Sequence, residues 1–149
     1  MPKRRGSKPR FRRSTFEKRV EQDLEERGVK AKYEPKHYRY VTFHQYTPDY
    51  LLPNGIFIEV KGWFTADDRK KLLKIREAYP TLDVRLVFDR DNKIHKVSKT
   101  HYSDWCDKHG FKWALKTVPQ EWLEEPPKEI PKSLTKKALA EEVVKGKLK

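Results

Sequence analysis

The stretch of residues 46–62, which reads YTPDYLLPNGIFIEVKG, constrains the fold of this chain more than any other. Two short apolar runs, residues 50–52 and 56–58, flank a Pro-Asn-Gly turn, and this pattern predicts a β-hairpin. Pro53 presets φ at the first turn position, and Gly55 can adopt the left-handed conformation that closes a three-residue loop with a bulge. The turn therefore predicts that the residues on either side of it, Leu52 and Ile56, face each other.

The register set by this turn brings two carboxylates together. Counting back from the turn pairs Leu51 with Phe57, Tyr50 with Ile58, and Asp49 with Glu59. Like charges placed opposite each other are destabilising, so a fold that keeps them there uses them, most simply as ligands for a divalent cation. A two-residue Asn-Gly loop would instead slip the pairing and separate the acids.

Alternation along the second strand adds a third polar group to the same face. Lys61 shares a face with Glu59, whereas Ile56, Ile58 and Val60 are expected to point into a core. An ordinary surface hairpin with solvated acids and lysine is the alternative. The agreement between turn type, strand alternation and carboxylate pairing favours a functional site.

Composition bounds the class of protein and its partners. The 149 residues suit one domain with arms, and the formal net charge of +13 favours a polyanionic partner, most commonly nucleic acid. No signal peptide or membrane span is recognisable, so a cytoplasmic protein without a membrane partner is expected. The single cysteine, Cys106, excludes an internal disulfide and is expected to serve packing alone, and the five scattered histidines form no zinc-type cluster.

Three segments follow from charge and patterning. Residues 1–13 form a basic arm that is expected to be disordered until it meets phosphate, residues 14–125 the folded domain, and residues 126–149 a basic tail rich in Pro and Lys. A solubilising tail is the alternative for the arm. Its seven basic residues are Lys3, Arg4, Arg5, Lys8, Arg10, Arg12 and Arg13.

A helix is expected to follow the basic arm. Ser14 is the predicted N-cap, with Glu17 at the capping-box position, and an apolar stripe of Phe16, Val20 and Leu24 ends before Gly28. Glu17 has two interpretations that its spacing cannot separate: a capping residue, or a further carboxylate of the metal site.

The remaining pattern predicts a mixed α/β fold. Cys106 would lie on the helix predicted over residues 101–109, and Val60 on the second strand of the hairpin. The predicted elements are one or two strands within residues 29–43, the hairpin, a helix over 67–79, a strand over 83–88, a short strand over 93–97, a helix over 101–109 stopped by Gly110, an edge strand over 111–114, a short helix from 118, and a partly helical segment over 135–144.

With these residues in hand, the chain resembles the PD-(D/E)XK nuclease superfamily and, more closely, the endonuclease I family of the T-odd bacteriophages. The long hairpin string is the most specific part of the likeness, which covers roughly residues 11–131. The matching segments are residues 11–20 with Glu17, the string YTPDYLLPNGIFIEVKG, residues 67–71, residues 75–77, His109-Gly110 and residues 119–122.

The resemblance implies a restriction-endonuclease-like mixed sheet flanked by helices, in a domain-swapped homodimer. It implies that Asp49, Glu59, the backbone carbonyl of Val60 and Glu17 bind Mg²⁺, two ions per site, with Mn²⁺ able to substitute and no organic cofactor. Lys61 would orient or activate the attacking water. In such a dimer Glu17 acts in trans, and the short connection over residues 39–45 leaves the geometry of the bridge open.

The implied function is a magnesium-dependent endodeoxyribonuclease that resolves four-way (Holliday) junctions and other branched DNA during recombination, in the host cytoplasm if the chain is phage-encoded. The alternative is a non-catalytic basic protein that binds or packages nucleic acid. Trp63 and Phe64 are expected to pack in the core rather than to stack on bases. Candidate phosphate contacts are Arg4, Arg5, Arg10, Arg12, Arg13, Arg69, Lys70, Lys71 and Lys74.

Overall fold

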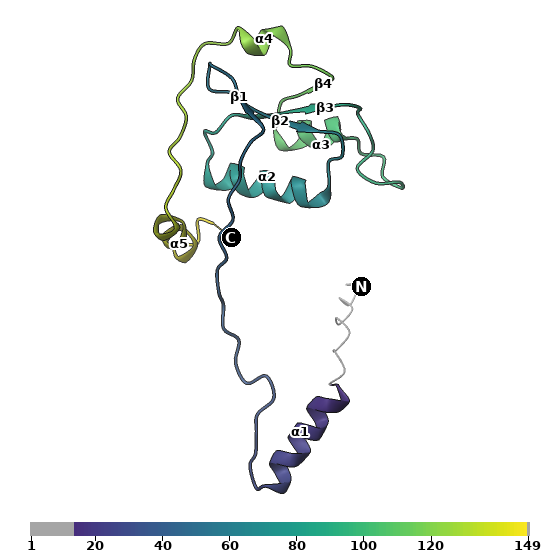
Figure 1. Ribbon diagram of the computed structural model, residues 1–149, viewed down its shortest axis with the longest axis vertical. Coiled ribbons are helices and arrows are strands. Elements are labelled where there is room, and N and C mark those ends of the chain that lie inside the picture. The colour runs from purple at the N-terminus through teal and green to yellow at the C-terminus, as the bar shows by residue number, and fades with distance from the viewer. Residues whose placement is uncertain (1–13, 149) are drawn as a thin grey trace, which may run out of the picture. The chain divides into compact units, whose positions relative to one another are not determined.

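The computed structural model describes residues 14–148, which form two compact units (Figure 1). The first extends to Tyr40 and the second begins at Val41. The basic arm predicted for residues 1–13 lies outside the described residues. No helix within residues 14–148 is both long enough and apolar enough to cross a membrane.

The first unit contains helix α1, Thr15–Glu26, as the sequence predicts. The side chain of Ser14 accepts a hydrogen bond from the backbone N–H of Glu17 at 3.1 Å, so the predicted N-cap is confirmed. The apolar stripe is left without cover in this unit, because α1 has no buried residue and Phe16 is 72% exposed.

The strands predicted within residues 29–43 are wrong. The segment between α1 and the hairpin has no regular secondary structure, and Tyr38 and Tyr40 are exposed. The tyrosines have the side-chain type that strands favour, but a strand also needs a hydrogen-bonded partner, and none pairs with this segment among the described residues.

The second unit is built on a four-stranded mixed sheet in the order β1-β2-β3-β4. The strands are β1, Tyr50–Leu51; β2, Phe57–Lys61; β3, Val84–Phe88; and β4, Trp113–Leu115. β1 runs antiparallel to β2, with Tyr50 opposite Ile58 and Leu51 opposite Phe57, which confirms the predicted register. β2, β3 and β4 are parallel, and β4 is the predicted edge strand.

The helices cover both faces of the sheet (Figure 1). Helices α2, Ala66–Ala78, and α3, Tyr102–His109, provide the crossovers between the parallel strands. Gly110, at φ 72°, ends α3 as predicted. Two further helices, α4, Gln120–Leu123, and α5, Lys136–Val144, follow the sheet.

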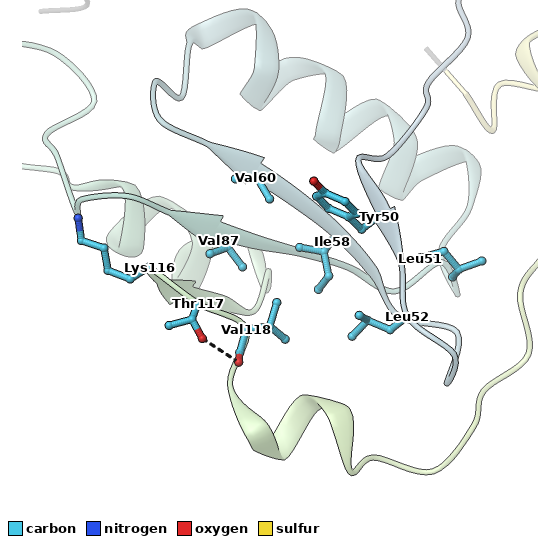
Figure 2. A pocket seen from close by; sticks show the side chains of 9 residues that line it. All are labelled: Tyr50, Leu51, Leu52, Ile58, Val60, Val87, Lys116, Thr117 and Val118. Atoms are coloured by element: carbon cyan, nitrogen blue, oxygen red, sulfur yellow. Dashed lines mark hydrogen bonds between the residues drawn. The ribbon is translucent and has the colours of Figure 1, made fainter.

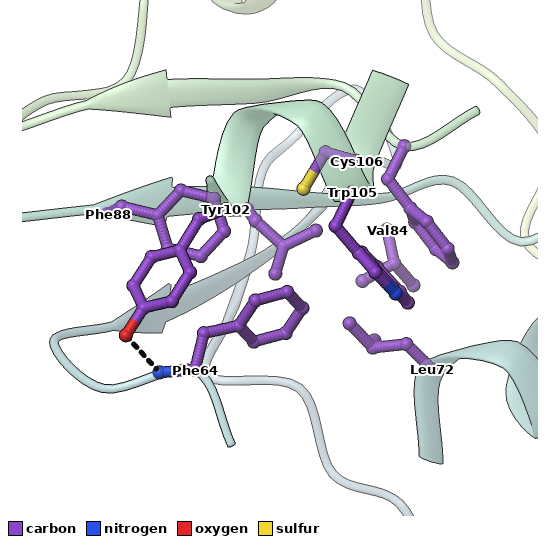
Figure 3. Packing of buried hydrophobic residues seen from close by; sticks show 9 residues of the cluster. Phe64, Leu72, Val84, Phe88, Tyr102, Trp105 and Cys106 are labelled. Carbon is purple, nitrogen blue, oxygen red and sulfur yellow. Dashed lines mark hydrogen bonds between the residues drawn. The ribbon is translucent and has the colours of Figure 1, made fainter. Parts of the chain in front are cut away.

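The larger core cluster lies between the sheet and helices α2 and α3. Phe64, Tyr102 and Trp105 make edge-to-face contacts at its centre, with Phe64 5.1 Å from Trp105 between ring centroids (Figure 3). Cys106 is fully buried there, and this burial raises the pKa of its thiol to about 12, in line with a packing role. The smaller cluster joins Ile56 and Ile58 to Trp122 of α4 on the other face.

Three details of the prediction are corrected. Val60 is 49% exposed rather than in a core, because the smaller cluster ends at Ile58 and leaves the far end of β2 uncovered. Residues 93–97 form no strand and contribute a single bridge between Lys93 and His101. Trp63 is 77% exposed, whereas its neighbour Phe64 is buried as predicted.

Candidate functional site

The Pro-Asn-Gly turn closes the hairpin as a three-residue loop. Leu52 N–H donates to the carbonyl of Ile56 at 2.8 Å, and Gly55 N–H donates to the carbonyl of Leu52 at 3.0 Å. Gly55 has φ +87°, the left-handed conformation that the turn requires. These bonds confirm the predicted turn and fix the register of everything on β1 and β2.

The turn is also held from outside by the segment that follows α4. Asn54 is buried, and its side-chain amide donates to the carbonyls of Trp122 at 2.7 Å and Glu125 at 3.2 Å. Lys128 N–H in turn donates to the carbonyl of Asn54 at 3.0 Å. A Cβ at Gly55 would lie 2.6 Å from the Lys128 carbonyl oxygen, so the two segments are in close contact.

Asp49 stands where the ladder between β1 and β2 ends. One step beyond the observed pairs brings it level with Glu59, and its Oδ2 accepts the backbone N–H of Val60 at 2.8 Å. The carboxylate thus accepts the hydrogen bond that a backbone carbonyl of a neighbouring strand would otherwise accept. Asp49 is exposed, so it stays accessible to a ligand.

Glu59 is the buried member of the carboxylate pair, at 7% exposure. Its Oε2 accepts a hydrogen bond from the hydroxyl of Tyr46 at 2.8 Å, and its Oε1 lies 3.3 Å from Nζ of Lys61. Burial, the bond to Glu59, and the charges of Glu59 and Asp49 together raise the pKa of Tyr46 well above its ordinary value. Both carboxylates therefore act electrostatically on one phenol.

Lys61 is held between two acids. Its Nζ lies 3.1 Å from Oδ1 of Asp68 and 3.3 Å from Glu59. Partial burial works against the charge, but the bond to Asp68 and the field of Glu59 outweigh it and raise the pKa of Lys61. The side chain is therefore an ammonium at neutral pH.

Asp68 belongs to the capping box of α2. Its Oδ2 accepts the backbone N–H of Thr65 at 3.0 Å, and the Thr65 hydroxyl accepts the backbone N–H of Asp68 at 3.1 Å. Burial opposes ionisation, but the bonds from Thr65 and Lys61 lower the pKa of Asp68. One carboxylate thus caps a helix and also positions the lysine.

Sequence reasoning missed Tyr46 and Asp68 as parts of the site. Tyr46 opens the hairpin string but precedes the first strand, so no alternation pattern assigned it to a face. Asp68 lies in the first turn of α2, where an acid has a sufficient explanation in the positive end of the helix. The signal for Asp68 was its distance of seven residues from Lys61, across one short loop.

The donor set suits a hard divalent cation. Carboxylates of Asp49 and Glu59 and the carbonyl of Val60 are oxygen donors, and Mg²⁺ is commonly held by one or two carboxylates together with substrate phosphates. Within residues 14–148, no group of three or more His, Cys, Asp or Glu side chains has the geometry of a metal site. The two carboxylates and the carbonyl of Val60 are the oxygen donors that the second unit could offer to such a cation.

Glu17, the remaining predicted carboxylate, belongs to the first unit. It lies exposed on α1, and its Oε2 accepts a hydrogen bond from the hydroxyl of Tyr33 at 3.1 Å. The structure thus groups Asp49, Glu59 and Lys61 on one unit and carries Glu17 on the other.

The predicted phosphate contacts fall into three groups. Lys70, Lys71 and Lys74 are exposed on α2. Arg69 is partly occupied, because its guanidinium donates to the carbonyl of Phe64 at 2.7 Å. The arm residues Arg4, Arg5, Arg10, Arg12 and Arg13 lie outside the described residues.

An open apolar groove runs along the sheet face away from α2 and α3 (Figure 2). It measures about 300 Å³, and the side chains of Ile58, Val60 and Val87 form its floor. Tyr50 and Leu51 flank it and are exposed. The groove extends from the smaller core cluster, with which it shares Ile58 and Val87, along the strand that also carries Glu59.

Comparison with known proteins gives consistent results along the chain. The family model described as phage endonuclease I matches residues 1–142. The chain is 50% identical over 123 residues to endonuclease I of Escherichia phage T7, covering 80% of this chain and 83% of that protein. It is also 50% identical over 133 residues to endodeoxyribonuclease 1 of Enterobacteria phage T3, covering 85% and 88% respectively.

Proposed function

The chain belongs to the phage endonuclease I family, and we propose that it is a metal-dependent endodeoxyribonuclease that resolves four-way junctions and other branched DNA. The name of the first relative supports a nuclease, and the name of the second supports cleavage of DNA. The observation that carries the proposal is the acidic cluster on the hairpin, in which Asp49 and Glu59 are held level with each other and Lys61 lies 3.3 Å from Glu59.

The proposed cofactor is Mg²⁺, two ions per site, with Mn²⁺ as a substitute. Asp49, Glu59 and the carbonyl of Val60 would hold it, with Glu17 completing the set. When bound, such ions polarise the phosphodiester and lower the pKa of water. The repulsion between Asp49 and Glu59 supports this assignment, because a cation between them turns a destabilising arrangement into a binding site.

Lys61 contributes a fixed positive charge to the proposed reaction. Its ammonium would stabilise the negative charge that grows on the phosphate oxygens and would orient the attacking water. Asp68 keeps that ammonium in place, and Tyr46 fixes the carboxylate of Glu59. Both are positioning residues, because they act through the groups that meet the substrate.

The proposed assembly is a domain-swapped homodimer in which Glu17 acts on the hairpin of the other chain. Two apolar surfaces, one on each unit, support this assembly. The stripe of Phe16 and Val20 on α1 is exposed, and the groove beside Ile58 and Val60 is open. A two-fold dimer carries two sites, which suits a substrate cut on two opposed strands.

The proposed DNA contacts are electrostatic and read shape rather than base sequence. The net charge of +13 and the exposed lysines of α2 support binding to phosphates. Binding should therefore weaken steeply as salt is raised. Selectivity for branched DNA would come from the fixed separation of two sites.

Cleavage of a labelled four-way junction and its linear duplex, with and without Mg²⁺, tests the function. Asp49→Asn and Lys61→Ala should abolish cleavage and keep junction binding. Asp67→Asn, which removes a neighbouring exposed acid outside the cluster, is the matched control and should cut normally. A non-catalytic packaging protein would bind DNA without cutting it, and normal cutting by Asp49→Asn would refute the site assignment.

Mixing two inactive variants tests the dimer. Glu17→Ala chains and Asp49→Asn chains should each be inactive alone. If Glu17 acts in trans, a mixed dimer regains one intact site and nicks one strand of the junction. Absence of nicking in proven heterodimers would place the whole site within one chain.

A further inference from the structure

Trp63 is an exposed indole next to the proposed active site. It is 77% exposed, whereas Trp105 and Trp122 are each 8% exposed and the indole N–H of Trp113 donates to Asp107 at 2.9 Å. Tryptophan offers one of the largest apolar areas that a side chain can bury. Its position in solvent is therefore the exception among the four tryptophans of the chain.

The residues on both sides of Trp63 make tertiary contacts. Lys61 is bound to Glu59 and Asp68 before it. Phe64 follows it, with its ring in the larger core cluster, its N–H donating to the hydroxyl of Tyr102 at 3.3 Å and its carbonyl accepting from Arg69 at 2.7 Å (Figure 3). The residues on either side of Gly62 and Trp63 are therefore held by tertiary contacts.

The indole also lies within reach of a nucleotide held at the site. Trp63 lies two positions after Lys61, a distance of at most about 7 Å of backbone at the rise of an extended chain. That distance is about two steps along a stacked DNA strand. The exposed Lys70 and Lys71 follow on α2 and supply positive charge for phosphates beside the acidic cluster.

We propose that Trp63 stacks on the face of a base that is uncovered at a branch point, next to the phosphodiester held by Asp49, Glu59 and Lys61. This inference rests on the proposed function. In a linear duplex each base face is covered by its neighbours except at the ends, whereas a branch point interrupts the stack. Aromatic stacking accepts any base, so Trp63 adds selectivity for branched structure without selectivity for sequence.

Equilibrium binding without divalent ions separates this contact from catalysis. The probes are a four-way junction and a linear duplex of matched length and sequence, with EDTA present. Trp63→Leu keeps an apolar side chain but removes the aromatic face, and should weaken junction binding about 5- to 150-fold, the range for one stacked base. Binding to the duplex should change less than twofold, and Trp63→Phe should keep most of the junction affinity.

Fluorescence provides a second measurement on the same complexes. The exposed indole should dominate the emission that a soluble quencher reaches in the free protein. Junction DNA should protect that fraction and linear duplex should not, and the effect should vanish in Trp63→Phe. Val97→Ala, which truncates another exposed apolar side chain of the second unit, is the control and should bind both DNAs as the parent does.

Each contrary result is distinct. Unchanged junction binding by Trp63→Leu, or equal weakening on junction and duplex, overturns the stacking proposal while cleavage by the parent protein upholds the proposed function. A change in molar mass of Trp63→Leu by light scattering without DNA would show that the indole is a protein interface and would also overturn it. Failure of the parent protein to bind or cut DNA would overturn the proposed function itself.

Discussion

Two charged clusters lie on the same sheet and differ in how their charges balance. The hairpin cluster consists of Asp49, Glu59, Asp68 and Lys61, three acids and one ammonium, in which Lys61 pairs with Glu59 and Asp68. The Arg85 cluster consists of Arg85, Asp83, Glu125, Lys128 and Lys112, two acids and three cations. One cluster has an excess of negative charge, and the other has enough positive charge to pair both of its acids.

The charged groups of the Arg85 cluster are paired with one another. Arg85 is 1% exposed, and its guanidinium donates to Asp83 at 2.8 and 2.9 Å and to Glu125 at 2.6 and 2.7 Å. Burial opposes the ionisation of Asp83, but the bonds from Arg85 and Lys128 outweigh it and lower the pKa of Asp83 to about 2. The bond from Arg85 likewise lowers the pKa of Glu125 to about 2. Both acids of this network are paired with cations, so removing one partner would leave a buried charge uncompensated, whereas the hairpin cluster keeps negative charge that a cation can use.

The largest expected effect contrasts one acid from each cluster. Glu59→Gln should reduce cleavage of a junction at saturating Mg²⁺ about 1,000-fold, equivalent to ~4 kcal/mol, because it removes a proposed metal ligand. Its free energy of unfolding should stay the same or rise, since a repulsion is relieved. Single-turnover cleavage and urea denaturation measure the two quantities.

Glu125→Gln is the matched variant and should show the opposite pattern. It should lower the free energy of unfolding and leave cleavage per folded molecule close to that of the parent. If both variants lost activity without losing stability, the proposed division between a hairpin cluster that serves cleavage and an Arg85 cluster that serves stability would be wrong.

Removing the cation of the Arg85 cluster should give the next largest effect. Arg85→Ala leaves Asp83 and Glu125 without their guanidinium partner, and should destabilise the protein by about 4 kcal/mol in urea denaturation. Arg69→Ala removes a less buried guanidinium and is the control, with a clearly smaller loss expected. An equal loss of unfolding free energy in both variants would show that the Arg85 cluster does not stabilise the fold more than an ordinary arginine contact.

Gly55→Ala tests whether the Arg85 cluster positions the hairpin, because Gly55 lies against Lys128 of that cluster. The substitution forces an alanine to φ +87° and places its Cβ 2.6 Å from the carbonyl oxygen of Lys128, so a destabilisation of about 3 kcal/mol is expected. The Mg²⁺ concentration needed for half-maximal cleavage should rise as well. Gly146→Ala has a similar φ of +75° in open space, and should show only the smaller backbone cost.

Acid should weaken the Arg85 cluster. Because the folded pKa of Asp83 lies below its ordinary value, its ion pair stabilises the protein at neutral pH and is lost as the pH falls from about 4 toward 2. The contribution of Asp83 is about 2 kcal/mol at most. Urea denaturation across this range should show a shallower pH dependence in Asp83→Asn, and an unchanged slope would argue against the network.

Local chemistry explains what the sequence could predict. The turn at residues 53–55 specifies its own register, so the level placement of Asp49 and Glu59 follows from neighbours in the chain. Helix α1 is likewise specified by its cap and stripe. Contacts between distant segments were not accessible: the bond from Tyr46 to Glu59, the pairing of Lys61 with Asp68, and the burial of Arg85 within a strand all depend on tertiary packing.

The exposure of Val60 and Trp63 has the same origin. Alternation correctly assigned the face on which Val60 lies, but α4 covers that face only as far as Ile58. Trp63 and Phe64 are adjacent aromatic residues, and composition alone does not decide which of them enters the core. In each case the missing information is which neighbouring element lies over the residue.

The bonds from Asn54 to the chain beyond α4 also set an order of events during synthesis. The carbonyl of Trp122 that holds the turn lies 68 residues after it in the sequence. At a translation rate of about 5–20 residues per second, the ribosome reaches that partner roughly 3–14 seconds after it has made the turn. The hairpin acquires its final support only when most of the chain has been made, so the site matures late and a chain truncated before Trp122 lacks this support.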